Sequence, residues 1–308
     1  MKGLELAERY YLCCGKDMLE RAFPRYKDRI ACGLAGEGSD CLGFDDALSQ
    51  DHDFGPGFCM WLTDEDEAEI GEALRAAYGT LPQSFMGYAA RDPVSYGEQR
   101  LSAMRFTRFY MKFTGLPRAP ESLEEWRRIP EHFLSAAVSG AVFEDALGAF
   151  GAIRKRLLAF YPEDIRLKKL AARAARMGQA GQYNYARCVK RGEAAAALCA
   201  LSAFVEASCS MVHLLNRRYT PWYKWAHRSL ADMRVLPEAH GLIGALCADD
   251  ATVRRRLDLI EEICARVIAV LRAQGLTSLD SDFLLDHAPA IMRGIEDERI
   301  GAMHPMAE

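Results

Sequence analysis

The sequence predicts an α+β fold in two parts: a mixed sheet with flanking helices over residues 1–160, followed by a helical bundle over residues 161–308. Before residue 160, short apolar runs with aromatic and β-branched residues alternate with Gly- and Pro-rich loops, a pattern typical of strands. After Pro162 the helical period continues almost without interruption. A chain of 308 residues is long enough for two domains, each with its own core.

Helices and strand-like runs alternate in the first part. Helices are expected over residues 3–14 and 64–77, the second with Thr63 as its N-cap and an acidic first turn that suits the positive end of the helix dipole. The segments expected to supply the strands and the loops beside them are "RIACGLAGEGS", "DHDFGPGFCMWL", "RFTRFYMKF" and "SGAVFEDALGAF".

Two long helices dominate the second part. The stretch 253–271 places its apolar residues on one stripe, follows an Asp249-Asp250 cap and ends at Gly275. The stretch 192–217 is apolar around much of its circumference, as a central bundle helix would be. It contains Glu206 and His213, so we interpret it as a buried helix rather than a membrane span, and His213 as a core histidine.

Composition excludes several classes of function. The net charge of -4 gives no general attraction to a long nucleic acid or to a membrane surface. The N-terminus carries charges where a signal peptide would need an apolar core, so a cytoplasmic protein is expected. The ten cysteines form no C-x-x-C pair, and the seven histidines show no zinc spacing, so we expect reduced thiols and no zinc.

The stretch "GEGSDCLGFDDALSQDHDFGPGF" (36–58) indicates a phosphate and metal site. Gly38 and Ser39 follow a strand-like run; glycine permits close backbone approach, and Ser39 offers a hydroxyl and an N–H at the expected start of a helix. In an extended strand, Asp51 and Asp53 would point to one side and could share divalent ions. Magnesium prefers such oxygen ligands together with substrate phosphates.

Other interpretations of this stretch fail on spacing. It lacks the lysine of a Walker loop, the third glycine of a dinucleotide fingerprint and the glutamate of an EF-hand. Its remaining acids are expected to act as caps or loop-surface residues; these are Glu37, Asp40, Asp45 and Asp46.

The chain contains a pattern that resembles the signature of the polymerase β-like nucleotidyltransferase superfamily: Gly-Ser, about ten residues, and then Asp-x-Asp. With "SGAVFEDALGAF", "GQYNYARCVKRGE" and "LNRRYTPWYKW", the chain is most similar to an uncharacterised bacterial family within it, known mainly as a domain of unknown function. The resemblance implies a nucleotidyltransferase fold in residues 1–160. It also implies two Mg²⁺ ions held by three carboxylates, attack of a hydroxyl on the α-phosphate of a nucleotide, and release of pyrophosphate.

Asp51 and Asp53 match the metal-binding pair of that superfamily, and Gly38 with Ser39 match its phosphate-binding element. The third carboxylate should act as general base. We favour Asp145 for this role, with a turn or cap function as the equal alternative; Glu144 and Glu98 are further candidates.

The helical part would form the other wall of the nucleotide cleft. At helical spacing, Asn184 and Arg187 share one face, and Tyr219 and Lys224 lie near the helix break at Pro221. All four are candidates for nucleotide binding. The alternative is that the cations cover the bundle surface and the aromatic residues belong to its core.

We therefore expect a Mg²⁺-dependent nucleotidyltransferase that moves a nucleoside monophosphate, AMP from ATP or the equivalent from another NTP, to a hydroxyl of a small molecule or protein. The alternatives are a catalytically inactive nucleotide-binding or regulatory module and, more remotely, a metal-dependent phosphohydrolase. Expected partners are the nucleotide and an unidentified hydroxyl-bearing acceptor, with neither a long nucleic acid nor a membrane among them. A second copy of the chain is a further candidate partner, as a homodimer, although no sequence motif indicates one.

Overall fold

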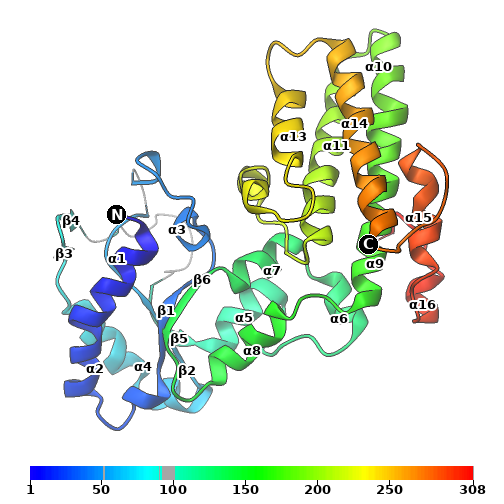
Figure 1. The fold of residues 1–308 in the computed structure, drawn as a ribbon. Coiled ribbons are helices and arrows are strands. Elements are labelled where there is room, and N and C mark those ends of the chain that lie inside the picture. The colour runs from blue at the N-terminus through cyan, green and yellow to red at the C-terminus, as the bar shows by residue number, and fades with distance from the viewer. Residues whose placement is uncertain (51–52, 90, 92–100, 308) are drawn as a thin grey trace. The chain divides into compact units, whose positions relative to one another are not determined.

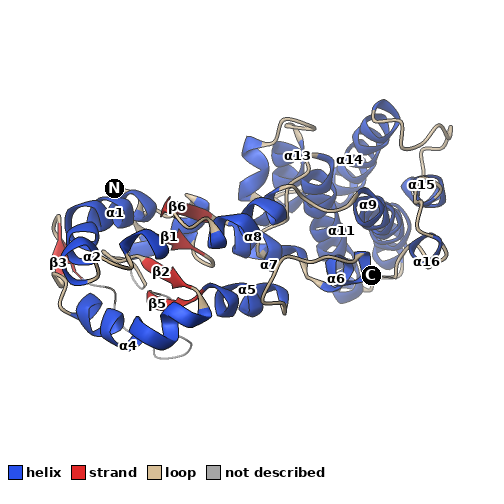
Figure 2. Cartoon of the chain, turned by 90° about the horizontal axis from the view of Figure 1, so that it is seen from below, coloured by secondary structure: helices blue, strands red, loops and turns tan. Residues whose placement is uncertain are grey.

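The computed structural model describes residues 1–50, 53–89, 91 and 101–307. The chain divides into two compact units. We call residues 1–120 and 133–159 the sheet unit, and residues 121–132 and 160–308 the helical unit. The division falls beside the boundary expected at residue 160, and it assigns residues 121–132, which precede that boundary, to the helical unit. The α+β class is confirmed, and Figure 2 shows the strands gathered in the sheet unit.

A four-stranded mixed sheet lies at the centre of the sheet unit, in the order β5-β2-β1-β6. β1 pairs antiparallel with β2 and β6, whereas β2 pairs parallel with β5. A separate hairpin joins β3 to β4. The strands are β1 (Ala31–Ala35), β2 (Cys59–Leu62), β3 (Ser84–Phe85), β4 (Tyr88–Ala89), β5 (Ser102–Arg105) and β6 (Gly140–Glu144).

Helices cover both faces of this sheet (Figure 1). Their bounds are α1 (Gly3–Tyr10), the π-helix η1 (Tyr11–Gly15), α2 (Lys16–Ala22), η2 (Lys27–Arg29), α3 (Ser39–Leu42), η3 (Leu48–Gln50), α4 (Asp64–Gly79), α5 (Phe106–Thr114) and α8 (Ala149–Leu158). α7 (Glu131–Val138) is split between the two units.

The alternation of side chains along β2 explains why helices pack on both faces. Met60 and Leu62 are fully buried in the cluster formed with α1, α2 and α4. Trp61 points the other way and stacks on Phe150 of α8, with ring centroids 3.9 Å apart and an angle of 13° between the planes. It also meets Phe109 of α5 edge-on. Both faces of the strand are therefore apolar.

The prediction of a strand over "RFTRFYMKF" is wrong, because α5 occupies most of it. Phe109 and Phe113 lie four residues apart and bury the same helical face, so this aromatic run satisfies helical spacing as well as strand composition. The Thr63 cap of α4 is confirmed, since its hydroxyl accepts the N–H of Asp66 at 3.1 Å.

The helical unit is built around α9, which packs against α11 and α15. α13 packs on α14 (Figure 1). The bounds are α6 (Leu123–Arg128), α9 (Glu163–Met177), the π-helix η4 (Gly178–Tyr185), α10 (Ala186–Lys190), α11 (Ala194–Leu215), α12 (Tyr223–Ala226), η5 (Arg228–Asp232), α13 (Ala239–Cys247), α14 (Val253–Ala273), α15 (Leu284–Met292) and α16 (Glu298–Gly301).

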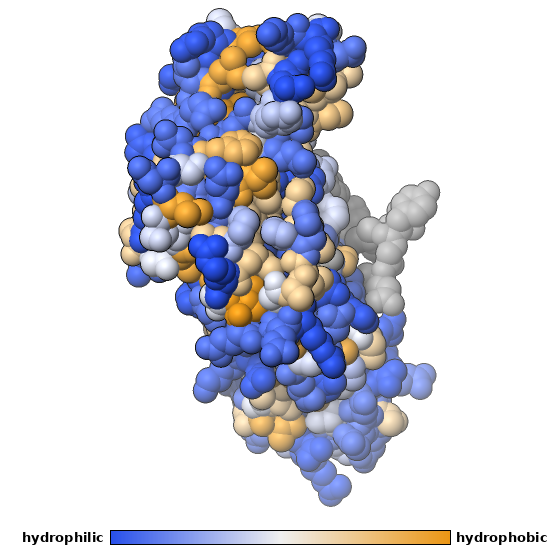
Figure 3. Space-filling model, turned by 90° about the vertical axis from the view of Figure 1, so that its right-hand side faces the viewer, coloured by the Kyte–Doolittle hydropathy of each residue, from blue (hydrophilic) through white to orange (hydrophobic). Residues whose placement is uncertain are grey.

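The two long helices form as predicted, with one different cap. α14 begins after Thr252, whose hydroxyl accepts the N–H of Arg255 at 3.2 Å, rather than after an Asp249-Asp250 cap. α11 is long and apolar enough to cross a membrane, as core helices of soluble proteins also are, and half of its most apolar window is buried. On the face shown in Figure 3, hydrophobic residues form small separate patches among hydrophilic ones.

Candidate functional site

A glycine turn joins the central strand β1 to the short helix α3. Gly36 and Gly38 have φ angles of 109° and 120°, a region that residues with a Cβ rarely adopt. Ser39 is the first residue of α3. The structure therefore places Gly38 and Ser39 at the strand-to-helix turn at the end of a buried strand.

Asp53 does not lie on a strand, so the expected alternation of Asp51 and Asp53 along an extended segment is wrong for the described part. β2 begins at Cys59, and Asp53 occupies a bend with a left-handed φ of 48°. The chain between them includes Pro56, which lacks a backbone donor, so a strand is disfavoured there. Asp51 lies outside the described residues.

Arg91 gathers two carboxylates beside this turn. Its Nη2 donates to Oδ2 of Asp40 at 2.9 Å, and its Nη1 lies 3.5 Å from Oδ1 of Asp53. It also donates to the carbonyl oxygens of Asp53 and Gly55, at 2.8 and 3.1 Å. The Arg91 side chain is only 5% exposed, whereas that of Asp53 is 31% exposed. Asp53 is thus held near the first turn of α3 with part of its carboxylate open to solvent.

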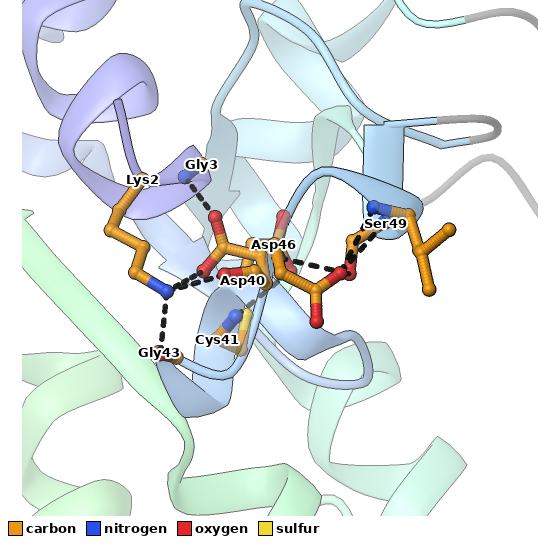
Figure 4. A network of polar contacts seen from close by, with 9 residues as sticks. Lys2, Gly3, Asp40, Cys41, Gly43, Asp46 and Ser49 are labelled. Carbon is orange, nitrogen blue, oxygen red and sulfur yellow. Dashed lines mark hydrogen bonds and ion pairs between the residues drawn. The ribbon is translucent and has the colours of Figure 1, made fainter.

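The loop after α3 is fastened to the N-terminus of the chain (Figure 4). Oδ2 of the buried Asp45 accepts the N–H of Gly3 at 2.8 Å, and Lys2 donates to the carbonyl oxygens of Gly43 and Asp45. Asp46 accepts the N–H groups of the η3 turn, as a cap does. Of the acids expected as caps or loop-surface residues, Asp40 and Asp45 are buried, and Asp45 bonds the first N–H of α1 as a cap would.

Asp145 is engaged in local structure. Its two carboxylate oxygens accept the N–H groups of Gly148 and Gly151, at 3.0 and 2.7 Å, and so cap the start of α8. Glu144 accepts the Tyr11 hydroxyl at 2.5 Å and pairs with Lys16 at 3.5 Å; Glu98 lies outside the described residues. Within the described ranges, no group of three or more His, Cys, Asp or Glu side chains forms a metal site.

The nucleotide-binding candidates of the helical unit lie on different elements: Asn184 in η4, Arg187 in α10, Lys224 in α12, and Tyr219 before α12. The exposed Arg187 lies over the Tyr183 ring at 4.8 Å, and Lys224 lies over the Trp225 ring at 5.5 Å. Asn184 lies in the π-helix η4, so the face assigned from α-helical spacing is not kept.

Tyr219 packs as a core residue in the helical unit. Its ring is 4.9 Å from that of Phe160 and 5.0 Å from that of Tyr161, and burial raises its pKa. His213 is confirmed as a core histidine: Nδ1 contacts the Cys209 carbonyl oxygen and Nε2 the Ser229 hydroxyl, both at 2.7 Å.

A buried ionic cluster in the helical unit was not predicted from the sequence. The Glu131 carboxylate accepts from Arg173 at 2.8 Å, from Ser210 at 2.9 Å and from Thr220 at 2.6 Å. Burial acts to raise the pKa of Glu131, but Arg173, Lys169 and the hydroxyls outweigh it and lower the pKa to about 2. Glu131 is therefore a carboxylate throughout the neutral range.

Comparison with known proteins adds a family and one solved structure. A family described as "Domain of unknown function (DUF4037)" matches residues 126–226. A nucleotidyltransferase-like protein of known structure from Exiguobacterium sibiricum 255-15 is similar over 92% of this chain and 81% of its own, with 13% identity and a TM-score of 0.36. This similarity is too low to transfer an activity. None of the curated proteins matches the sequence.

Proposed function

We propose that this chain is a Mg²⁺-dependent nucleotidyltransferase that transfers a nucleoside monophosphate, AMP from ATP in the first instance, to a hydroxyl of a small molecule or protein. The observation that carries the proposal is the β1–α3 turn, where Arg91 holds Asp53 beside a helix that begins at Ser39. The turn offers backbone and hydroxyl donors, and Asp53 offers a partly exposed carboxylate.

The residues of this turn suit the two halves of a metal–nucleotide complex. Glycine at position 38 leaves room for a phosphate to approach the backbone, and Ser39 would donate to its oxygens. Asp53, with Asp51, would supply the hard oxygen ligands that Mg²⁺ prefers, and the ion would neutralise charge that develops on the phosphates. Asp40 would keep Arg91 in place beside them.

The test is pyrophosphate release from ATP and Mg²⁺ over a panel of hydroxyl-bearing acceptors. Asp53→Asn and Asp51→Asn keep the side-chain shape but remove the charge, and each is expected to abolish release. Asp46→Asn is the matched control, because Asn can still cap the η3 turn, and it should release pyrophosphate like the wild type. Full activity in both site variants would overturn the proposal.

A catalytically silent nucleotide-binding or regulatory module is the second candidate. It is favoured by the engagement of Asp145 in capping α8, because Asp145 was the preferred third carboxylate. Calorimetry with ATP and Mg²⁺ separates the two functions, since binding without pyrophosphate release over the acceptor panel supports the module.

A further inference from the structure

The helical unit contains a cavity of about 390 Å³, a volume within the range of small-molecule sites. Its walls come from α9, α11, the start of α7 and the segment 220–227. Every one of these segments belongs to the helical unit, so the cavity is complete without any part of the β1–α3 turn.

One wall of the cavity is cationic. Lys169, Arg173 and Arg176 lie at four- and three-residue spacing along α9, so they form one stripe facing the cavity. Glu131 compensates Arg173, with which it shares a hydrogen bond of 2.8 Å. The other lining carboxylate, Glu206, is exposed on α11.

Lys169 lines the cavity and shares the Glu131 carboxylate with Arg173, so two cations face one negative charge. The residue is 5% exposed, and its Nζ lies 4.0 Å from the Glu131 carboxylate, beyond hydrogen-bond distance. Its other close contact is the Tyr161 ring, at 5.4 Å. Within the described part of the chain, no acceptor forms a hydrogen bond with this ammonium group, and because Lys169 lines the cavity, its N–H bonds are open to an acceptor bound there.

We infer that this cavity binds a small organic anion, whose carboxylate or phosphate group would reach Lys169 while its apolar body rests on Val205, Pro221 and Tyr223. An anion there would accept from the Lys169 ammonium group and offset the excess of positive charge on this wall. Arg176, exposed on the same stripe, would give a second, weaker contact. This inference is independent of the proposed nucleotidyl transfer.

The test is isothermal titration calorimetry of the full chain with phenyl phosphate and with benzoate, which distinguish the two anionic groups. Benzyl alcohol is the neutral probe of similar size. The wild type should bind one equivalent of at least one anion, with affinity on the order of millimolar or tighter, and should bind benzyl alcohol more weakly. Failure of both anions to bind, or equal binding of benzyl alcohol, would overturn the inference.

Variants locate the binding. Lys169→Met should weaken anion binding by about tenfold or more, because a charge-assisted hydrogen bond is lost, and Arg176→Gln should weaken it by a smaller factor. Lys168→Met is the matched control on α9; Lys168 bonds the carbonyl oxygens of His304 and Pro305 and does not line the cavity.

Arg176 is exposed, so Arg176→Gln is expected to fold. If Lys169→Met does not fold, the affinity of Arg176→Gln for the anion tests the site. Wild-type affinity in Lys169→Met, or in Arg176→Gln when it alone is folded, would refute the site. Lys168→Met should bind the anion like the wild type, and a loss there as large as in Lys169→Met would contradict the assignment to the cavity.

Discussion

Replacing Glu131 by Gln should destabilise the helical unit strongly, although the change removes one charge and almost no volume. Arg173 donates to this carboxylate at 2.8 Å and the buried Lys169 lies 4.0 Å away, so the variant removes the negative charge that both cations face. Removal of one partner from a buried pair typically costs about 3–5 kcal/mol.

The pKa of Glu131 gives a second route to the magnitude. Folding lowers this pKa from its ordinary 4.5 to about 2. At about 1.4 kcal/mol per pKa unit, the charged carboxylate contributes roughly 3 kcal/mol to the free energy of unfolding at neutral pH. Because the folded pKa is the lower one, this contribution is complete above about pH 4.5 and is lost as the pH falls towards about 2.

The assay is urea unfolding followed by tryptophan fluorescence at pH 7 and at pH 3. The signal comes mainly from the helical unit, which holds Trp126, Trp222 and Trp225. Glu131→Gln should lower the free energy of unfolding by about 3 kcal/mol at pH 7, with a smaller difference from the wild type at pH 3.

Glu124→Gln is the matched control for this experiment. Arg127 and Arg128 also lower the pKa of Glu124 to about 2, but its carboxylate is 45% exposed, and solvent screens the interaction. The loss should therefore be much smaller. A Glu131→Gln variant as stable as the wild type at pH 7, or no more affected than Glu124→Gln, would refute the reasoning.

Three further predictions concern other residues. Asp145→Ala should lower the free energy of unfolding of the sheet unit by about 0.5–2 kcal/mol, through loss of the α8 cap, but leave the rate of pyrophosphate release intact; a lost rate with normal stability would make Asp145 a site residue. Gly38→Ala places a Cβ at a φ of 120°, so calorimetry should show weaker ATP binding and thermal unfolding a lower midpoint, and unchanged values for both would contradict a role for this turn. Burial lowers the pKa of His213 to about 4, so the unfolded state binds more protons between about pH 4 and pH 6.5 and stability should rise with pH there; His213→Gln should flatten this slope in urea unfolding, and an unchanged slope would refute the assignment.

Features encoded by neighbouring residues could be predicted from the sequence. The strand before Gly36, the Thr63 cap and the long helices each depend on local spacing or on one side chain bonding to a nearby N–H. The α5 segment favours a strand by its aromatic composition and a helix by the spacing of its aromatic residues, and burial against Trp61 selects the helix.

Features that depend on long-range contacts could not be predicted in this way. The partners of Glu131 are Arg173, Ser210 and Thr220, which follow it in the sequence by 42, 79 and 89 residues. No sequence motif connects these positions. The contacts of Arg91 with Asp40 and Asp53 are also long-range. Asp40 lies in the first turn of α3, whereas Asp53 and Arg91 lie in two separate loops. One sequence feature does point to the ionic cluster around Glu131: the spacing of Lys169, Arg173 and Arg176 places three cations on one face of α9.

The proposed function is tested most directly by following the α-phosphate and the γ-phosphate of ATP into the products. The chain is incubated with Mg²⁺, a hydroxyl acceptor and ATP labelled either at the α-phosphate or at the γ-phosphate. The account predicts that the α-label joins the acceptor, that the γ-label leaves as pyrophosphate, and that Asp53→Asn abolishes both. Release of the γ-label as orthophosphate, or equal transfer by Asp53→Asn, would contradict it.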